Sequence, residues 1–204
     1  EFVRDVLCDR CHVENLIVGH DFRFGRKAEG DFDFLVQQSG VFGFRVSQAP
    51  VVLIDGERVS STLIRERLLA GDLAEVEIFL GRKYSILGEV VPGRSIGKTL
   101  GFPTANVQPY HSAVPAQGVY AAEVLIGKAR YCAAVNIGIA PTIRNEDVVV
   151  EAHVLDFSEE VLGREIEIVF HKRLRPEKKF PSREDLVKQI AQDVRDIREY
   201  FGEN

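Results

Sequence analysis

The spacing of apolar residues divides the chain into two parts of different character. Segments with strand-like and with helical spacing alternate over about the first 80 residues. The expected strands are 15–19, 42–46 and 51–54, and the expected helices are 32–38, 62–70 and 72–81. Such alternation is typical of a parallel, doubly wound α/β sheet. The first part therefore resembles the last portion of a Rossmann-like domain.

After Gly81 the pattern changes to strands without helices between them. The turns between the strands carry Gly, Pro and Asn. The expected strands are 84–91, 118–126, 130–137, 148–157 and 165–172. Successive strands of this kind predict an antiparallel sheet or a closed barrel.

The last segment has the spacing of an amphipathic helix. Ser182 is placed to cap its first turn. Its apolar face is formed by Leu186, Ile190, Val194, Ile197 and Phe201. We expect this helix to close one end of the barrel. We also expect a domain limit near Arg82, which gives domains of residues 1–82 and 83–204.

Composition narrows the functional classes. The chain has 204 residues and a formal net charge of -5, which disfavours a general nucleic-acid binder. No apolar run reaches the roughly 18 residues that span a membrane. Three cysteines predict no disulfide framework and therefore a reducing cytoplasm. Cys8 to His12 matches a haem-attachment pattern, but nothing else in the sequence points to haem, and incidental thiols near a helix end are the favoured explanation.

Residues 93–106, with the sequence GRSIGKTLGFPTAN, are the first candidate for chemistry. Glycines let backbone N–H groups approach an anion, and Lys98 adds positive charge. Thr104 and Asn106 offer two neutral oxygens suited to a hydrated magnesium ion. The spacing before Gly97 is one residue too short for a Walker P-loop. A simple glycine-rich hairpin loop remains the alternative.

Glu151 is the candidate base. Strand alternation places it on the same face as Val149, His153 and Leu155. If that face points into the barrel, burial favours a carboxylate that accepts a proton. The alternative is an edge strand with Glu151 in solvent.

Three further segments carry charge. Residues 172–179 hold five cations and precede Phe180, which suits a flat anionic ligand or, alternatively, a solvated loop. Residues 20–27 follow the first strand, where open α/β sheets bind ligands. Ser60, Ser61 and Thr62, with Arg65 one turn later, can hold phosphate or simply cap a helix.

Four motifs together closely resemble the riboflavin kinase family. They are GKTLGFPTAN (97–106), VNIGxxPT (135–142), EAHVLDF (151–157) and LRPEKKF (174–180). Two more, VGHDFRFG (18–25) and SSTLIR (60–65), resemble the FMN adenylyltransferase domain that precedes this kinase in bacteria. The whole chain is therefore similar to the C-terminal two-thirds of a bifunctional riboflavin kinase/FAD synthetase.

The resemblance implies a six-stranded Greek-key barrel from residue 83 and the conversion of riboflavin and ATP to FMN and ADP. It makes Glu151 the base, and it makes Thr104 and Asn106 the ligands of Mg²⁺. It places ATP near Gly93, Gly97, Lys98, Gly101, Pro103, Thr104, Val154, Asp156 and Leu162. It places the flavin near Arg175, Lys178 and Phe180. The adenylyltransferase remnant is Asp21, Phe22, Arg23, Phe24, Ser60, Ser61, Thr62 and Arg65.

The adenylyltransferase of the family begins with a His-x-Gly-His type segment that this chain lacks. We therefore expect residues 1–82 alone not to make FAD. Two alternatives to the kinase are a flavin- or nucleotide-binding module without turnover and an oligonucleotide-binding barrel. We expect small-molecule substrates, no membrane and no nucleic-acid partner, while a monomer is one option for the oligomeric state.

Overall fold

The computed structural model describes residues 1–93, 96–111, 113–141 and 146–202. They form two compact units, Glu1–Val59 and Ser60–Asn204. The domain limit near Arg82 stays a prediction. Within the described ranges, no helix combines the length and apolar character needed to cross a membrane.

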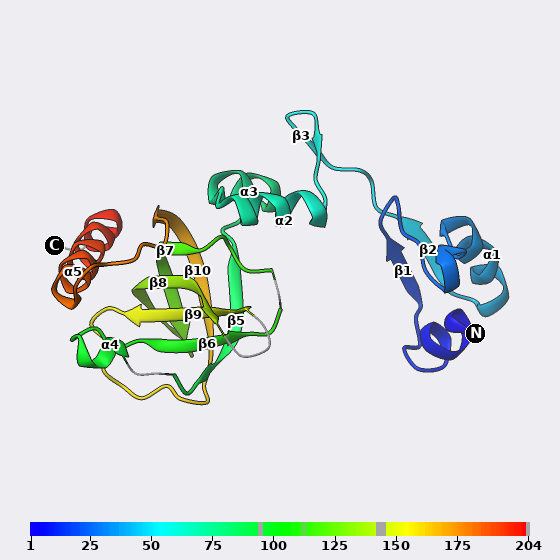
Figure 1. The fold of residues 1–204 in the computed structure, drawn as a ribbon. Coiled ribbons are helices and arrows are strands. Elements are labelled where there is room, and N and C mark those ends of the chain that lie inside the picture. The colour runs from blue at the N-terminus through cyan, green and yellow to red at the C-terminus, as the bar shows by residue number, and fades with distance from the viewer. Residues whose placement is uncertain (94–95, 112, 142–145, 203–204) are drawn as a thin grey trace. The chain divides into compact units, whose positions relative to one another are not determined.

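The first unit is built on a β-α-β arrangement (Figure 1). Strand β1 (Asn15–Val18) pairs in parallel with β2 (Arg45–Gln48), and helix α1 (Phe32–Phe42) connects them. The remaining elements are the π-helix η1 (Phe2–Cys8), the short helix η2 (Arg26–Ala28) and the hairpin β3 (Leu53–Ile54) and β4 (Glu57–Arg58). Val3, Val18, Leu35 and Phe44 form its core.

Two expectations for this unit were wrong in their bounds. Helix α1 continues to Phe42 and ends at Gly43, whose φ of +78° gives the left-handed cap. The strand expected at 42–46 therefore begins later, at Arg45. Asp55 and Gly56, both with positive φ, form the turn between β3 and β4.

The second unit is a closed antiparallel barrel with the strand order β10-β5-β6-β9-β8-β7. Strands β9, β8, β7 and β10 lie side by side in the Greek-key order that the family resemblance implies. The strands are β5 (Ser85–Val91), β6 (Ala105–Pro109), β7 (Gly118–Ile126), β8 (Ala129–Pro141), β9 (Glu146–Val154) and β10 (Glu165–Arg175). The apolar pattern alone missed β6, which lies between two prolines at the end of the glycine-rich segment.

The barrel interior is filled by one apolar core. Tyr120, Val135, Ile168 and Phe170 are each fully buried in it. Helices α2 (Ser61–Ala70) and α3 (Leu73–Leu80) add Leu68 and Val76 to the same core. Ser60 caps α2, which is the alternative to phosphate binding that the sequence offered, and Asp72 caps α3.

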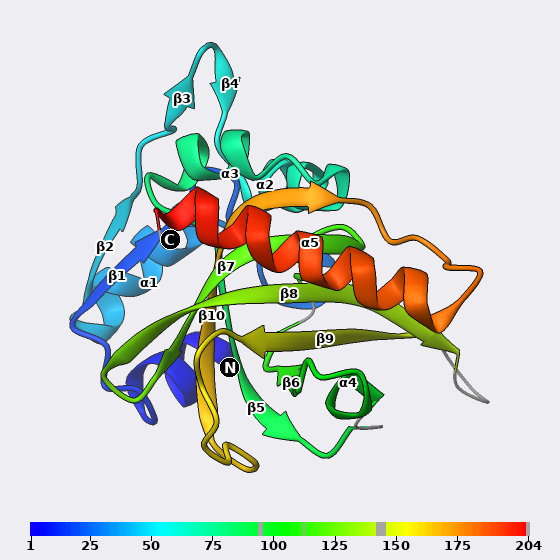
Figure 2. The same ribbon diagram turned by 90° about the vertical axis from the view of Figure 1, so that its left-hand side faces the viewer.

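Helix α5 (Arg183–Phe201) does not close an end of the barrel, which corrects the expectation from sequence. It lies along the outer wall, over β8 and β7 (Figure 2). The outward-facing Ala121 of β7 is buried with Ile197 of α5, and Ala134 of β8 packs against them. Small side chains on these strands leave room for a helix on the wall. The Ser182 cap of α5 is confirmed.

The strand β9 ends at Val154 rather than at residue 157. Asp156 has a φ of +54°, which is incompatible with an extended strand. Its carboxylate accepts a hydrogen bond from Arg198 at 2.7 Å, which lowers the pKa of Asp156. This pair holds the turn after β9 against the C-terminal part of α5.

A second polar contact lies beside the C-terminal end of α5. Glu123 Oε2 lies 2.6 Å from His171 Nε2 and accepts from Arg130 at 2.7 Å. The His171 ring packs edge-on against Phe201, with centroids 4.9 Å apart. Burial acts to raise the pKa of Glu123, but these hydrogen bonds outweigh it, so the pKa lies below its ordinary value near 4.5.

We predict that Glu123→Gln costs about 1 kcal/mol of unfolding free energy at pH 7. Because the folded-state pKa of Glu123 is lowered, this stabilisation is complete above pH 4.5 and disappears as the pH falls through the folded-state pKa. The free energy of unfolding is measured for both proteins at pH 7 and pH 3 by urea denaturation followed by tyrosine fluorescence. All five tyrosines lie between residues 84 and 200, so the signal reports on the barrel unit. An equal cost at both pH values would contradict the assignment of this stabilisation to the ionised carboxylate of Glu123. Glu167→Gln is the control.

Candidate functional site

A cavity of about 270 Å³ opens on the outer wall of the barrel. Its floor comes from strands β7, β8, β9 and β10, and its sides come from the segment after α4 (Ile96–Thr99), the segment after β10 and helix α5. Its lining is Gly97, Leu100, Phe102, Thr104, Val119, Ala134, Asn136, Glu151, His153, Arg175, Glu177, Lys178, Phe180, Leu186, Ile190 and Asp193.

A row of paired residues crosses the wall of the barrel at this cavity. Asn106 pairs with Glu151, and Glu151 pairs with Asn136. The row continues to Val119 and then to Arg175. Directly paired residues point to the same face of a sheet, about 4.8 Å apart between strands. Register therefore brings residues from five strands into one line.

This row of paired residues lies on the outer face of the barrel. The neighbours of Glu151 along β9, Val150 and Ala152, are buried in the interior core. Glu151 therefore does not point into the barrel, as one sequence hypothesis had it. Nor does it lie on an edge strand, because β9 is paired on both sides. Glu151 is half-buried because the cavity is built over the outer wall.

The glycine-rich segment folds closely onto Thr104 and Asn106. A Cβ atom on Gly93 would lie 1.8 Å from Asn106 Nδ2, and one on Gly97 would lie 3.2 Å from Thr104 Oγ1. A Cβ atom on Gly97 would also lie 2.4 Å from the carbonyl oxygen of Phe102, so only glycine fits there, whereas a side chain at Gly93 would displace that of Asn106. Gly101 has a φ of +87°, which turns the chain after α4 toward Pro103.

Two further contacts anchor Thr99 and Pro103 of this segment. The carbonyl oxygen of Pro103 lies 2.8 Å from His153 Nδ1. Arg183 of α5 donates to the Thr99 carbonyl at 2.6 Å. Lys98 is exposed on α4 and does not line the cavity. Of the residues predicted for phosphate and magnesium, Gly97 and Thr104 line the cavity, and Gly93 lies against Asn106 beside it.

The basic segment after β10 gathers its predicted residues around one aromatic ring. The Arg175 guanidinium carbon and Lys178 Nζ each lie 5.7 Å from the centroid of Phe180. Arg175 is also paired with Asp193 of α5, with Nη2 to Oδ2 at 2.7 Å. Asp193 and Asn136 line the cavity but were given no role from sequence.

The position of Asp193 in the sequence of the helix could have identified it as a candidate site residue. It falls three residues after Ile190 and four before Ile197, which is a core-facing position of the helix. A carboxylate at such a position requires a buried partner. The partner, Arg175, is distant in sequence and could not be identified from spacing.

The structure does not bring Val154, Asp156 and Leu162 into this cavity. The Val154 side chain is 7% exposed and belongs to the barrel core. Asp156 is exposed in the turn after β9, and Leu162 is 53% exposed.

Within the first unit, the residues after β1 are held by ion pairs and ring contacts. Asp21 pairs with Arg58 at 2.9 Å, and its pKa is lowered by its own backbone N–H and then by Arg58. Arg23 pairs with Asp31 at 2.9 Å. The Phe24 ring contacts those of Phe2, Phe22 and Phe34.

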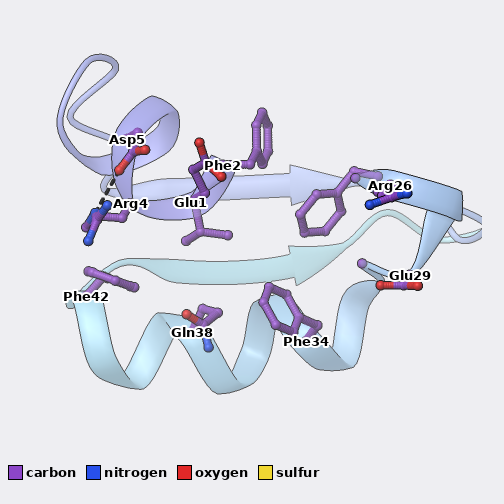
Figure 3. A pocket seen from close by; sticks show the side chains of 13 residues that line it. Glu1, Phe2, Arg4, Asp5, Arg26, Glu29, Phe34, Gln38 and Phe42 are labelled. Carbon is purple, nitrogen blue, oxygen red and sulfur yellow. Dashed lines mark hydrogen bonds and ion pairs between the residues drawn. The ribbon is translucent and has the colours of Figure 1, made fainter.

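The rings of Phe2, Phe24 and Phe34 border a second cavity, of about 780 Å³, within the first unit. Figure 3 shows the phenyl rings of Phe2 and Phe34 facing it, with the Arg4–Asp5 pair at one end and Arg26 at the other.

The predicted group at 60–65 belongs to the second unit. Ser60 Oγ accepts from the backbone N–H of Leu63 at 3.2 Å, so its hydroxyl caps α2. Ser61, Thr62 and Arg65 are exposed on the first turns of that helix.

Known proteins resemble this chain over nearly its whole length. The riboflavin kinase family model matches residues 80–201, and the FAD synthetase model matches residues 1–63. A bifunctional riboflavin kinase/FMN adenylyltransferase of Haemophilus influenzae is 39% identical over 98% of the chain and 66% of its own length. The protein of the same description from Escherichia coli K12 is 41% identical over 98% of the chain and 64% of its own length.

A solved structure shares the fold. The crystal structure of a protein from Streptococcus pneumoniae, described as a macrolide-efflux protein, has a TM-score of 0.72 and 30% identity, and covers 91% of this chain and 60% of that one. The chain thus spans a little less than two-thirds of the length of the proteins it matches. With the riboflavin kinase model matched across all six strands and α5, the chain belongs to the riboflavin kinase family.

Proposed function

We propose that the barrel unit transfers the terminal phosphoryl group of ATP to riboflavin, giving FMN and ADP. The observation that carries this proposal is the register of Glu151 between Asn106 and Asn136, on the wall of a cavity. A carboxylate lies there next to Asn106, which together with Thr104 is suited to a hydrated cation. The match to riboflavin kinases over residues 80–201 supports the same reaction.

The donor end of the proposed site fits a magnesium–phosphate group. Thr104 and Asn106 supply neutral oxygens, and the close approach of Gly93 and Gly97 leaves no side chain between backbone and ligand. Thr104 and Asn106 would hold Mg²⁺, which when bound neutralises charge on the phosphates. Asp156 and Leu162 remain proposed nucleotide contacts, whereas Val154 can contribute only its backbone.

The acceptor end of the proposed site takes the flavin. Phe180 with Leu186 and Ile190 of α5 offers an apolar surface for a flat ring system. Glu151 lies at the polar end, where its carboxylate accepts the proton of the primary hydroxyl as the phosphoryl group is transferred. Positioning of the two substrates in line supplies much of the remaining rate enhancement.

We further infer that the longer protein containing this chain adenylylates FMN to FAD. The match of residues 1–63 to FAD synthetase and the bifunctional relatives support this step. Among the described residues, Cys8, Cys11 and Cys132 form no disulfide, which is in keeping with a reducing cytoplasm as the compartment.

The decisive assay incubates the chain with riboflavin, ATP and Mg²⁺ and separates FMN from FAD by chromatography. We predict FMN without FAD. Riboflavin binding with neither product would favour a binding module without turnover, and FAD would contradict the expectation that residues 1–82 lack that activity.

We predict that Glu151→Gln lowers kcat by about 100- to 10,000-fold, because the variant loses the base but keeps the shape of the side chain. ATP binding, measured by calorimetry, should be nearly unchanged. Glu167→Gln, the same chemical change on the outer face of β10, is the matched control. Weakened ATP binding with normal turnover would refute the role of Glu151 as base.

We predict that Gly93→Ala raises the KM for ATP-Mg by about tenfold or more, because the new methyl group displaces the Asn106 side chain. The Kd for riboflavin should change by less than about twofold. Gly40→Ala, where a Cβ atom meets nothing within 4 Å, is the control. An unchanged KM for ATP would exclude Asn106 from the donor site.

A further inference from the structure

We propose that Asp193 is a positioning residue for the flavin, and that it acts by fixing the guanidinium of Arg175. The inference rests on the proposed kinase function and assigns a role to a residue of α5 that the sequence motifs do not contain.

The burial of Asp193 requires an explanation. Among the residues that the structure describes, it is the one charged side chain that is buried, with 3% exposure. Burying an unpaired carboxylate costs several kcal/mol, about the stability margin of a small domain. A carboxylate at this place is therefore tolerated only with a tightly matched partner.

Arg175 supplies that partner in a two-point arrangement. Its Nε donates to Asp193 Oδ1 at 3.0 Å, and its Nη2 donates to Oδ2 at 2.7 Å. Gln189 Nε2, one turn earlier on α5, donates to Oδ1 at 2.9 Å. Paired hydrogen bonds of this type fix the plane of a guanidinium as well as its position.

The fixed guanidinium in turn supports the aromatic wall of the cavity. Arg175 is the last residue of β10 and the last member of the row that contains Glu151. Its guanidinium carbon lies 5.7 Å from the centroid of Phe180. Its Nη1 donates to the carbonyl of Pro176 at 3.3 Å, so it also holds the start of the segment that leads to Phe180.

The charge balance indicates which substrate this arrangement serves. The carboxylate of Asp193 neutralises Arg175, so the pair presents no net charge to the cavity. The isoalloxazine ring of riboflavin is uncharged and flat, and a neutral pair beside an aromatic ring is suited to it. The phosphates of ATP instead need the donor end of the site, around Thr104 and Asn106.

A purely structural role for Asp193 predicts that its loss displaces α5 and raises the KM values for riboflavin and ATP equally. The positioning role predicts a different result. Helix α5 has other contacts with the barrel away from the cavity, namely Arg198 to Asp156 and Phe201 to His171. Loss of the Asp193 charge therefore leaves the helix attached and releases mainly Arg175. Flavin binding should weaken much more than nucleotide binding.

The test is Asp193→Asn, which keeps the shape and removes the charge. The Kd for riboflavin is measured by its fluorescence change on titration, and the KM values for riboflavin and ATP are measured by FMN production. We expect both riboflavin constants to rise about tenfold, with the KM for ATP within about twofold of wild type. Glu123→Gln, which weakens a polar contact beside the other end of α5, should leave all three constants unchanged.

Unchanged riboflavin binding in Asp193→Asn, or an equal rise of both KM values, would overturn the inference. If this variant fails to fold, Gln189→Ala removes one hydrogen bond to Asp193 but keeps the ion pair, and a Kd for riboflavin raised about threefold supports the role. No change in that variant counts against it.

A wild-type chain that binds riboflavin but makes no FMN defeats the kinase proposal, while the binding titration still decides the role of Asp193. A wild-type chain that does not bind riboflavin defeats both.

Discussion

The interior of the barrel is filled by its own side chains, and every feature of the candidate site follows from that constraint. Six strands close around Tyr120, Phe170 and the branched residues beside them. The cavity of the candidate site accordingly lies on the outside of this wall. Strand alternation then puts the outward residues of neighbouring strands in register, and α5 with the glycine-rich segment adds the side walls that a bare sheet lacks.

This arrangement explains why distant motifs converge. Asn106, Glu151 and Asn136 come from three segments of the sequence but are neighbours in one row. A shift of β9 by one residue would turn Glu151 into the core and Val150 to the surface. The interior packing that stabilises the barrel thus also fixes which carboxylate faces the cavity.

Much of the fold could be predicted from sequence because its signals are local. Helix caps such as Ser60 and Ser182, and the alternation in β10, depend on nearby residues only. The candidate site could be assembled in part through the family motifs. The outward direction of Glu151 could not be predicted, because alternation defines two faces without saying which one is inside. The prediction that α5 closes one end of the barrel was also wrong. Its position depends on small side chains in β7 and β8, and only strand pairing brings these together.

The hydrogen bond from Arg183 to Thr99 joins two walls of the cavity that have different proposed tasks. One wall carries the glycine-rich segment at the donor end, and the other is the helix that covers the acceptor end. This contact therefore fixes the spacing between the two ends of the proposed site, which transfer of a phosphoryl group from one substrate to the other requires.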